Sequence, residues 1–204
     1  MSLESMSVGS LISSLGEKTP TPGGGAVSSI VTALSAALGI MVVRYSTGKK
    51  RLAEHDELHC EALNTLDELA KRALSLADED ARAYGTLNAL MRANPGDDKP
   101  NEEWTKAVEA AIDAPVQVMS VCLGLMHMLD RLAGKTNRML SSDLAIAAIL
   151  SEAGAQAAAW NVRMNLPLLK DQGRVNEIRR ETDRLLNRAR VYCEKIEESC
   201  STTD

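Results

Sequence analysis

One acidic residue interrupts an apolar helical stripe and is the first candidate for chemistry. Between residues 50 and 92, apolar side chains recur at spacings of three and four, through Ala73, Ala77, Tyr84 and Leu87. Asp80 lies on this row, where an apolar residue is expected. A carboxyl group on a core-facing stripe is either paired, or raised in pKa by desolvation and available for proton transfer. The residues alone leave both readings open, and the paired structural acid is the commoner case.

A segment rich in proline and glycine leads directly into the most apolar stretch of the chain. Residues 20–25 read Pro-Thr-Pro-Gly-Gly-Gly, and a helix is expected to follow from residue 26. Exposed backbone donors at a helix start attract anions, and glycines let a ligand approach closely. A tight turn into a crowded helix is the alternative. Gly48 and Lys49 do not make a Walker motif, because the upstream glycine is missing.

Polar residues also mark both ends of one face of a helix expected over residues 140–166. Asp143, Asn161 and Asn165 share this face. Asp143 and Asn161 are eighteen residues apart, which is five whole turns, so they point the same way. On a straight helix they are separated by ~27 Å. They therefore cannot contact one small ligand from a single chain unless the helix breaks or a second subunit contributes. Structural hydrogen bonding is an equal alternative.

Two further groups could bind a ligand but have ordinary explanations. His55 and His59 have an i, i+4 spacing that suits zinc, but no third ligand is apparent and their neighbours are charged. We therefore expect no metal site. Arg44 and Lys49 belong to a short basic cluster after the apolar stretch. Such a cluster is usually a solvated helix end, although it could receive a carboxylate-bearing ligand.

The composition predicts that helices position all of these residues. The chain has 204 residues and is 45% hydrophobic, yet it contains no Phe and only 2% aromatic residues. Strands draw on aromatic and β-branched residues, whereas Ala and Leu lead the helix scale. No composition break divides residues 1–204, so we expect one all-α domain with an ordered core of about 6–198. The periodicity predicts a bundle of about six to eight helices, with Pro115 kinking or dividing one of them.

Charge and hydropathy limit the classes of partner. The net charge is −5 and no basic stripe is present, which argues against nucleic-acid binding. Residues 19–43 carry no charge and are long enough to span a bilayer, but prolines, glycines and hydroxyl side chains favour a long buried helix instead. Glu4 lies where a signal peptide would be basic. The four cysteines form no C-x-x-C pair, so we expect free thiols in the cytoplasm.

A series of short motifs spans nearly the whole chain in order. Thr-Pro-Gly-Gly-Gly-Ala-Val-Ser at 21–28 is followed by Ala-Ala-Leu-Gly at 36–39, Met-Val at 41–42 and Thr-Gly-Lys-Lys at 47–50. Asp-Glu-Asp-Ala-Arg-Ala-Tyr at 78–84, Ala-Pro at 114–115, Asn137, Ser-Asp at 142–143, Asn-Val at 161–162 and Asn-Leu at 165–166 come next. Together they resemble the cyclodeaminase domain of the formiminotransferase-cyclodeaminase family.

The resemblance implies an all-helical homodimer that acts on a folate without a metal or redox cofactor. In the cyclodeaminase reaction, N10 of 5-formimino-tetrahydrofolate attacks the formimino carbon, and ammonia leaves to give 5,10-methenyl-tetrahydrofolate. The family acid that matches Asp80 is taken as catalytic, so Asp80 is the expected proton shuttle. The substrate-binding positions that we assign from the resemblance are Pro22, Gly23, Gly24, Gly25, Lys49, Tyr84, Asn137, Asp143 and Asn161.

Two alternatives remain open at this stage. Methenyltetrahydrofolate cyclohydrolase is the first, because the same shuttle serves both reactions and no spacing separates them. The second is a non-catalytic helical dimer that binds folate or scaffolds a partner. An Asp80 that is salt-bridged to an arginine would favour this second alternative.

Overall fold

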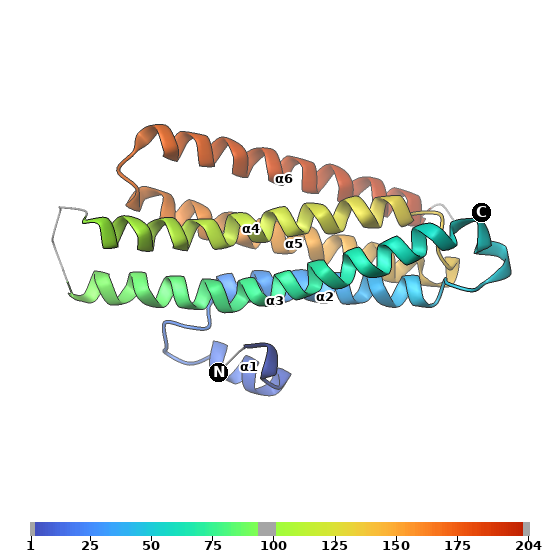
Figure 1. Cartoon of the computed structure of the whole chain (residues 1–204), viewed down its shortest axis with the longest axis horizontal. Helices are drawn as coiled ribbons and strands as arrows, with labels where there is room; N and C mark the ends of the chain where they lie inside the picture. The colour runs from blue at the N-terminus through green and yellow to red at the C-terminus, as the bar shows by residue number, and fades with distance from the viewer. Residues whose placement is uncertain (1–2, 94–100, 202–204) are drawn as a thin grey trace.

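The computed structural model describes residues 3–93 and 101–201, which form an all-helical bundle (Figure 1). Within these residues there are six α-helices and no strand. The helices are α1 (Val8–Leu15), α2 (Gly24–Arg44), α3 (Asp56–Ala93), α4 (Glu102–Leu132), α5 (Ser141–Asn165) and α6 (Gln172–Ser201). Short 3-10 turns lie at Leu3–Ser5, Lys50–His55, Arg138–Leu140 and Leu166–Leu168. The all-α prediction and the predicted number of helices are confirmed.

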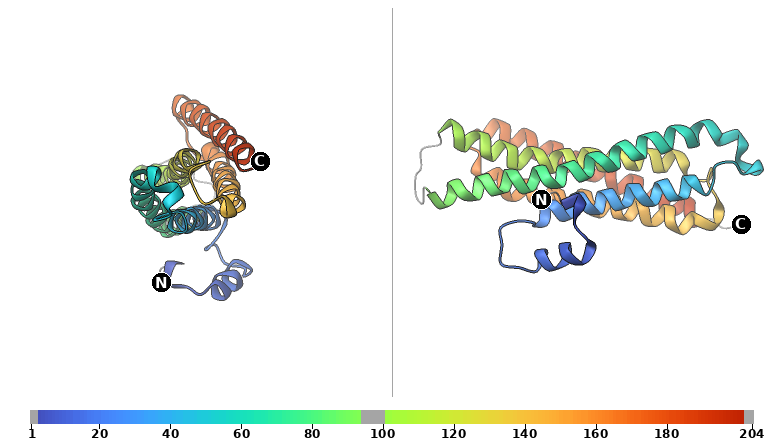
Figure 2. Two further views of the ribbon diagram at one scale, coloured as in Figure 1. Left: turned by 90° about the vertical axis from the view of Figure 1, so that its right-hand side faces the viewer. Right: turned by 60° about the horizontal axis from the view of Figure 1, so that its bottom comes forward.

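The five long helices α2 to α6 lie side by side, whereas the short α1 stands apart from them (Figure 2). Helix α2 packs against α3 on one side and α5 on the other, and it also touches α4. Helix α6 covers α4 and α5. The buried core runs along the bundle and is built mainly from Ala, Leu, Val and Met side chains of α2 to α6.

Helix α4 is continuous through Pro115, so of the two predicted alternatives, a kinked helix or a divided one, the division is excluded. A proline inside a helix removes one backbone hydrogen bond and costs about 3 kcal/mol. Both sides of Pro115 are buried in the core, with Ala111 and Ile112 before it and Val118 and Met119 after it. Burial of this long apolar face offsets the local cost, because each large buried side chain contributes about 1.5–3 kcal/mol.

Small residues let α2 approach its neighbours, and their hydroxyl groups are satisfied inside the bundle. Ser28 Oγ donates to the Gly25 carbonyl at 2.7 Å, and Ser35 Oγ donates across to the Ala147 carbonyl of α5, also at 2.7 Å. Thr32 Oγ1 donates to the Ser28 carbonyl at 2.8 Å. Buried hydroxyls therefore cause no desolvation penalty here, because each has an acceptor.

Two helices, α2 and α4, have the length and hydropathy of a membrane span. More than half of the apolar stretch of each lies inside the bundle, as is usual for core helices of this composition. Helix α2 still exposes one apolar face, which includes Val27 and Leu34. The expectation that α2 is buried on most faces therefore holds for the sides that face α3, α4 and α5.

Gly154→Ala is expected to destabilise the fold by about 1–3 kcal/mol, because overpacking exceeds the gain of up to ~1 kcal/mol in helix propensity. A Cβ at Gly154 would lie 2.5 Å from Thr32 Oγ1 and 3.3 Å from the Ser28 carbonyl oxygen, where α5 crosses α2. Urea unfolding followed by circular dichroism measures the change. Gly124→Ala is the control, since its Cβ would meet only Leu69 methyl groups at 3.4 Å. Equal stability of the two variants would contradict close α2–α5 packing.

Candidate active site

A cavity of about 350 Å³ lies where α2 begins, between α2, α3, α4 and α5. Its wall combines the glycine-rich entry to α2 with polar side chains of α3 and α5. The lining residues are Pro20, Thr21, Gly23, Gly24, Gly25, Asp80, Tyr84, Ala111, Asn161, Met164 and Asn165.

Asp80 lies directly against the first turn of α2. A Cβ atom added at Gly25 would overlap the carboxyl carbon and both carboxyl oxygens of Asp80. Gly25 is therefore the residue whose lack of a side chain makes room for this carboxyl group. The cap of α2 is Gly23, whose side chain cannot accept a hydrogen bond, so the first backbone N–H groups of the helix have no side-chain cap.

The Asp80 side chain makes no hydrogen bond or ion pair within the residues that the structure describes, whereas the acids beside it do. Glu79 is paired with Arg72 and also accepts from Ser75 Oγ at 2.8 Å. Asp78 accepts a hydrogen bond from the backbone N–H of Leu3 at 2.9 Å. Asp80 therefore lacks the arginine partner that would make it a structural acid.

Burial raises the pKa of the Asp80 carboxyl from 3.8 to about 6. Desolvation is the cause, because the charged form loses water and gains no compensating partner. A carboxyl with a pKa near the working pH can both accept and return a proton. This property fits a general acid–base group better than a structural one.

Several of the assigned site residues meet in the cavity, namely Gly23, Gly24, Gly25, Asp80, Tyr84 and Asn161. Pro22 lies in the same turn but does not line the cavity, whereas Pro20 and Thr21 do. The Asn161 amide nitrogen donates to the Ala157 carbonyl at 3.3 Å, and its Oδ1 faces Gly24.

Two lining residues of α5, Asn165 and Met164, were not among the assigned site residues, although Asn165 was placed on the same helix face as Asn161. Asn165 Nδ2 donates to the Ala111 carbonyl of α4 at 2.8 Å and so fixes α5 against α4 beside the cavity. Its position one turn after Asn161 was the available signal, because residues at i and i+4 share a helix face. Met164 carried no comparable signal, since apolar residues on helices are common.

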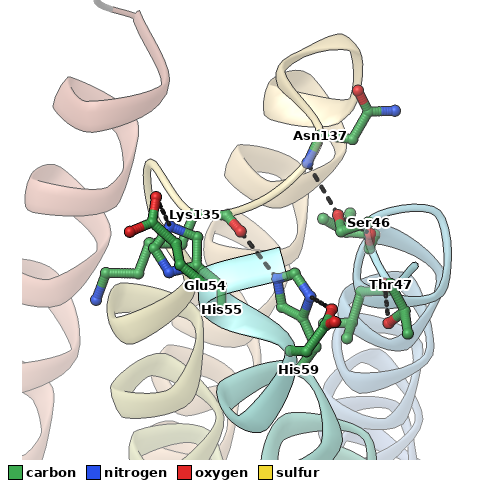
Figure 3. Close-up of polar contacts among 10 residues, drawn as sticks. Ser46, Thr47, Glu54, His55, His59, Lys135 and Asn137 are labelled. Carbon is green, nitrogen blue, oxygen red and sulfur yellow. Dashed lines mark hydrogen bonds and ion pairs between the residues drawn. The ribbon is translucent and has the colours of Figure 1, made fainter. Parts of the chain in front are cut away.

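Three other assigned residues, Lys49, Asn137 and Asp143, lie at the opposite end of the bundle. Helices α2 and α5 are unbroken, so the eighteen residues from Asp143 to Asn161 span ~27 Å. Asn137 is buried there, and its backbone N–H donates to Ser46 Oγ at 2.9 Å (Figure 3). Its Oδ1 accepts from Arg51 Nη2 at 2.7 Å. Within one subunit these three residues do not reach the Asp80 cavity.

His59 belongs to the same far-end cluster and is fully buried. Its Nε2 lies 2.9 Å from the carbonyl oxygen of Lys135 and donates to it, because a carbonyl only accepts (Figure 3). Its Nδ1 faces Asp56 Oδ1 at 3.9 Å. His59 therefore ties α3 to the loop that follows α4. In the ranges 3–93 and 101–201, no three His, Cys, Asp or Glu side chains are grouped as metal ligands would be.

Comparison with known proteins shows the family to which the chain is similar. Residues 7–184 match the family model described as formiminotransferase-cyclodeaminase. The chain is 29% identical to methenyltetrahydrofolate cyclohydrolase of Methylorubrum extorquens, with 91% of each protein covered. It is 30% identical to formimidoyltransferase-cyclodeaminase of Dictyostelium discoideum over 98% of the chain and 37% of that protein.

A solved structure extends the comparison to the fold. Formiminotetrahydrofolate cyclodeaminase from Thermotoga maritima superposes with a TM-score of 0.89 at 26% identity, covering 96% of both chains. The chain belongs to the formiminotransferase-cyclodeaminase family. It spans about a third of the formimidoyltransferase-cyclodeaminases that it matches, such as 35% of the Gallus gallus protein. The expected family resemblance is confirmed.

Proposed function

We propose that this protein is a folate one-carbon enzyme, formimidoyltetrahydrofolate cyclodeaminase, with Asp80 as its proton shuttle. The observation that carries the proposal is an unpaired carboxyl of pKa about 6 that lines a cavity at the glycine-rich start of α2. The family membership and the full-length similarity to the T. maritima cyclodeaminase support the choice of substrate.

In the proposed mechanism, Asp80 moves one proton between two nitrogens. The formimino group of the substrate enters in its protonated, amidinium form. N10 attacks the formimino carbon, the formimino nitrogen becomes an amino group, and the Asp80 carboxylate accepts the proton that N10 loses. The protonated Asp80 then donates that proton to the formimino nitrogen, the carbon–nitrogen bond breaks, and ammonia leaves. The product is 5,10-methenyl-tetrahydrofolate, and Asp80 is a carboxylate again. The uncapped N–H groups of α2 are available for a carbonyl or carboxylate oxygen of the folate.

Methenyltetrahydrofolate cyclohydrolase is the second candidate, because the M. extorquens cyclohydrolase matches the chain over almost its whole length. In that reaction water adds to the methenyl carbon and Asp80 accepts the water proton. Asp80 then donates the proton to the nitrogen whose bond to the carbon opens, and the hydroxyl oxygen becomes the formyl carbonyl of the 10-formyl form and releases its remaining proton to solvent. The same residue serves both reactions, and each transfers one proton through Asp80; hydrolysis also releases one net proton.

The proposal includes a homodimer in which α2 and α5 form the interface. Their outer surface exposes Val27, Leu34, Ile146 and Ile149, and α2 carries no charge before Arg44. If two copies pack these helices antiparallel about a two-fold axis, the far end of one subunit lies beside the cavity of the other. The partner's Lys49, Asn137 and Asp143 then complete the site, which one chain cannot do.

We further propose a cytoplasmic protein without metal, redox cofactor, nucleic-acid partner or membrane span.

An absorbance assay at the methenyl-tetrahydrofolate band tests the function. A rise of the band with ammonia release, from the formimino substrate, supports the deaminase. Faster decay of added methenyl-tetrahydrofolate supports the hydrolase. If the folded protein does neither, the enzyme proposal fails and a non-catalytic folate-binding or scaffolding dimer replaces it.

We propose that Lys49 binds a carboxylate of the glutamate tail of the folate. Lys49→Ala is then expected to raise KM for a polyglutamylated folate by about tenfold with little change in kcat, because such a charged contact contributes about 1.5–3 kcal/mol to binding. Steady-state kinetics with monoglutamate and polyglutamate substrates measures the effect, which should be smaller for the monoglutamate. Lys71→Ala is the matched control, since Lys71 is exposed and pairs with Asp67 on α3. A lower kcat with unchanged KM would contradict a tail-binding role for Lys49.

A further inference from the structure

Pro115 lies inside α4, and it leaves one carbonyl group of that helix without its usual donor. In an α-helix the carbonyl of residue 111 accepts from the N–H of residue 115, but proline has no N–H. The proline ring also crowds this carbonyl and pushes it away from the helix. Ala111 is only 2% exposed, so its carbonyl has little access to water. This carbonyl therefore needs a donor from another part of the chain.

The donor is the side chain of Asn165, the last residue of α5. Helices α4 and α5 pack against each other in the bundle (Figures 1 and 2). Asn165 Nδ2 lies 2.8 Å from the Ala111 carbonyl oxygen. Because a carbonyl oxygen only accepts, the nitrogen must be the end of the Asn165 amide that faces α4. The hydrogen bond thus fixes the way in which the amide is turned.

The oxygen end of the same amide is left for the cavity that holds Asp80. Asn165 lines this cavity, and within the described part of the chain its Oδ1 accepts no hydrogen bond. One turn earlier, Asn161 also directs its nitrogen to a carbonyl, that of Ala157, and its Oδ1 faces Gly24. The α5 side of the cavity therefore presents amide oxygens. A ligand that fits against it must supply hydrogen-bond donors.

We propose that Asn165 Oδ1 accepts a hydrogen bond from an N–H group of the bound substrate, and that Pro115 is the positioning residue that turns the amide this way. The reduced pterin ring of a folate carries such donors, in its ring N–H groups and its exocyclic amino group. The uncapped N–H groups of α2 line the same cavity and suit the oxygens of the ligand. The pterin is then held with its donors towards α5. This inference rests on the proposed function, because it takes the ligand to be a folate.

A double-mutant cycle tests the link between the proline and the amide. Urea unfolding compares the full-length wild type with Asn165→Ala, Pro115→Ala and the double variant. Asn165→Ala should raise the unfolding equilibrium constant about 10- to 100-fold, because it leaves the Ala111 carbonyl unpaired. In the Pro115→Ala background the same change should cost less than about threefold, since position 115 then has an N–H for that carbonyl. Loss of the proline ring is common to both members of this second comparison and cancels.

Isothermal titration calorimetry with tetrahydrofolate tests the oxygen end, because it measures binding without turnover. Asn165→Ala should raise the dissociation constant about three- to tenfold, the contribution of one neutral hydrogen bond. Asn165→Asp should raise it less, since a carboxylate keeps an oxygen for the substrate N–H, although it destabilises the fold by losing the donor to Ala111. Asn176→Ala, at an exposed position of α6, is the matched control and should leave the dissociation constant unchanged.

The same titration tests the positioning role of Pro115. In Pro115→Ala the amide of Asn165 is free to turn either end towards the ligand. Only one of these two orientations accepts the substrate N–H, so the dissociation constant should rise about twofold. A proline that serves only the fold would leave the dissociation constant of the folded variant unchanged, and this result would remove Pro115 from the proposal.

The outcomes separate this inference from the proposed function. Equal losses of stability from Asn165→Ala with and without Pro115 would overturn the link between the two residues. If the wild type binds tetrahydrofolate and Asn165→Ala binds it equally well, the role of Oδ1 is wrong and the proposed function stands. The same holds if Asn165→Asp weakens binding as much as Asn165→Ala. A wild type that does not bind tetrahydrofolate would overturn the proposed function and the role of Oδ1 together.

The double variant keeps the test decisive if Asn165→Ala does not fold. Its Ala111 carbonyl has a helical donor, so we expect it to fold, and circular dichroism checks its helix content. Its dissociation constant for tetrahydrofolate should exceed that of Pro115→Ala, because it lacks the amide oxygen altogether. Equal dissociation constants for these two variants would show that Asn165 Oδ1 does not contact the ligand.

Discussion

Asp80→Asn is expected to lower kcat by about 10²- to 10⁴-fold in whichever folate reaction the enzyme catalyses, while the bundle stays folded. An amide is close to a carboxyl in size but cannot accept and return the proton, and the side chain makes no hydrogen bond or ion pair in the described structure that the change would break. The absorbance assay, run beside circular dichroism, measures both properties. Asp78→Asn is the control, because Asp78 bonds the Leu3 N–H outside the cavity lining. A variant that keeps full activity would remove Asp80 from the mechanism.

The same substitution is expected to stabilise the protein at neutral pH. Burial raises the pKa of Asp80 from 3.8 to about 6, so the folded state favours the protonated carboxyl. The stability that this group contributes is full below its unfolded pKa and is lost as the pH rises through about 6. Above that pH the wild type holds a poorly solvated charge, which Asn removes. We expect a gain of about 1–3 kcal/mol at pH 7.5 that vanishes near pH 4.

Urea unfolding of wild type and Asp80→Asn across this pH range measures the predicted gain. A destabilised variant at pH 7.5 would instead identify Asp80 as a paired structural acid. The activity of the wild type should fall as the pH drops through about 6, because the attack step needs the carboxylate. Loss of activity combined with gain of stability is typical of a strained functional group.

Gly25→Ala is expected to cause the second largest loss of activity, about 10²-fold or more, because small displacements of a reacting group cost this much. Its Cβ would occupy the space of the Asp80 carboxyl group, so either the carboxyl or the start of α2 must move. Steady-state kinetics measures the loss, and it should fall mainly on kcat. Titration of activity with pH adds a second measure, because a displaced Asp80 should no longer show an apparent pKa near 6.

Gly85→Ala is the matched control for this prediction. It makes the same substitution in α3, beside the lining residue Tyr84, but a Cβ there would meet nothing within 4 Å. We expect unchanged kinetics and a gain of up to ~1 kcal/mol in stability, because Ala is the better helix former. If Gly25→Ala behaves like Gly85→Ala, the close contact between Gly25 and Asp80 is not needed for catalysis.

The sequence by itself determined the helical class of this protein, and it singled out Asp80 as an unusual residue without deciding its role. Helix formation depends on local properties, namely propensity and a repeat of three and four residues, and both can be read along the chain. The place of Asp80 on an apolar stripe was such a local signal. The separation of Asp143 from Asn161 was another, because the rise per residue of a helix is constant.

Only the tertiary structure decided which of these residues meet. The contact of Asp80 with Gly25 joins two helices far apart in sequence, and nothing local specifies it. Asn165 and Met164 line the cavity, and Pro115 lies inside α4. Both results have the same cause, because the packing of side chains that are distant in sequence outweighs local preference. Packing also placed Lys49 at the far end of the bundle, and it left Val8 and Ile12 of α1 exposed within the subunit. Helical periodicity shows which face of a helix is apolar, but the shapes of all the faces together decide which partner covers it.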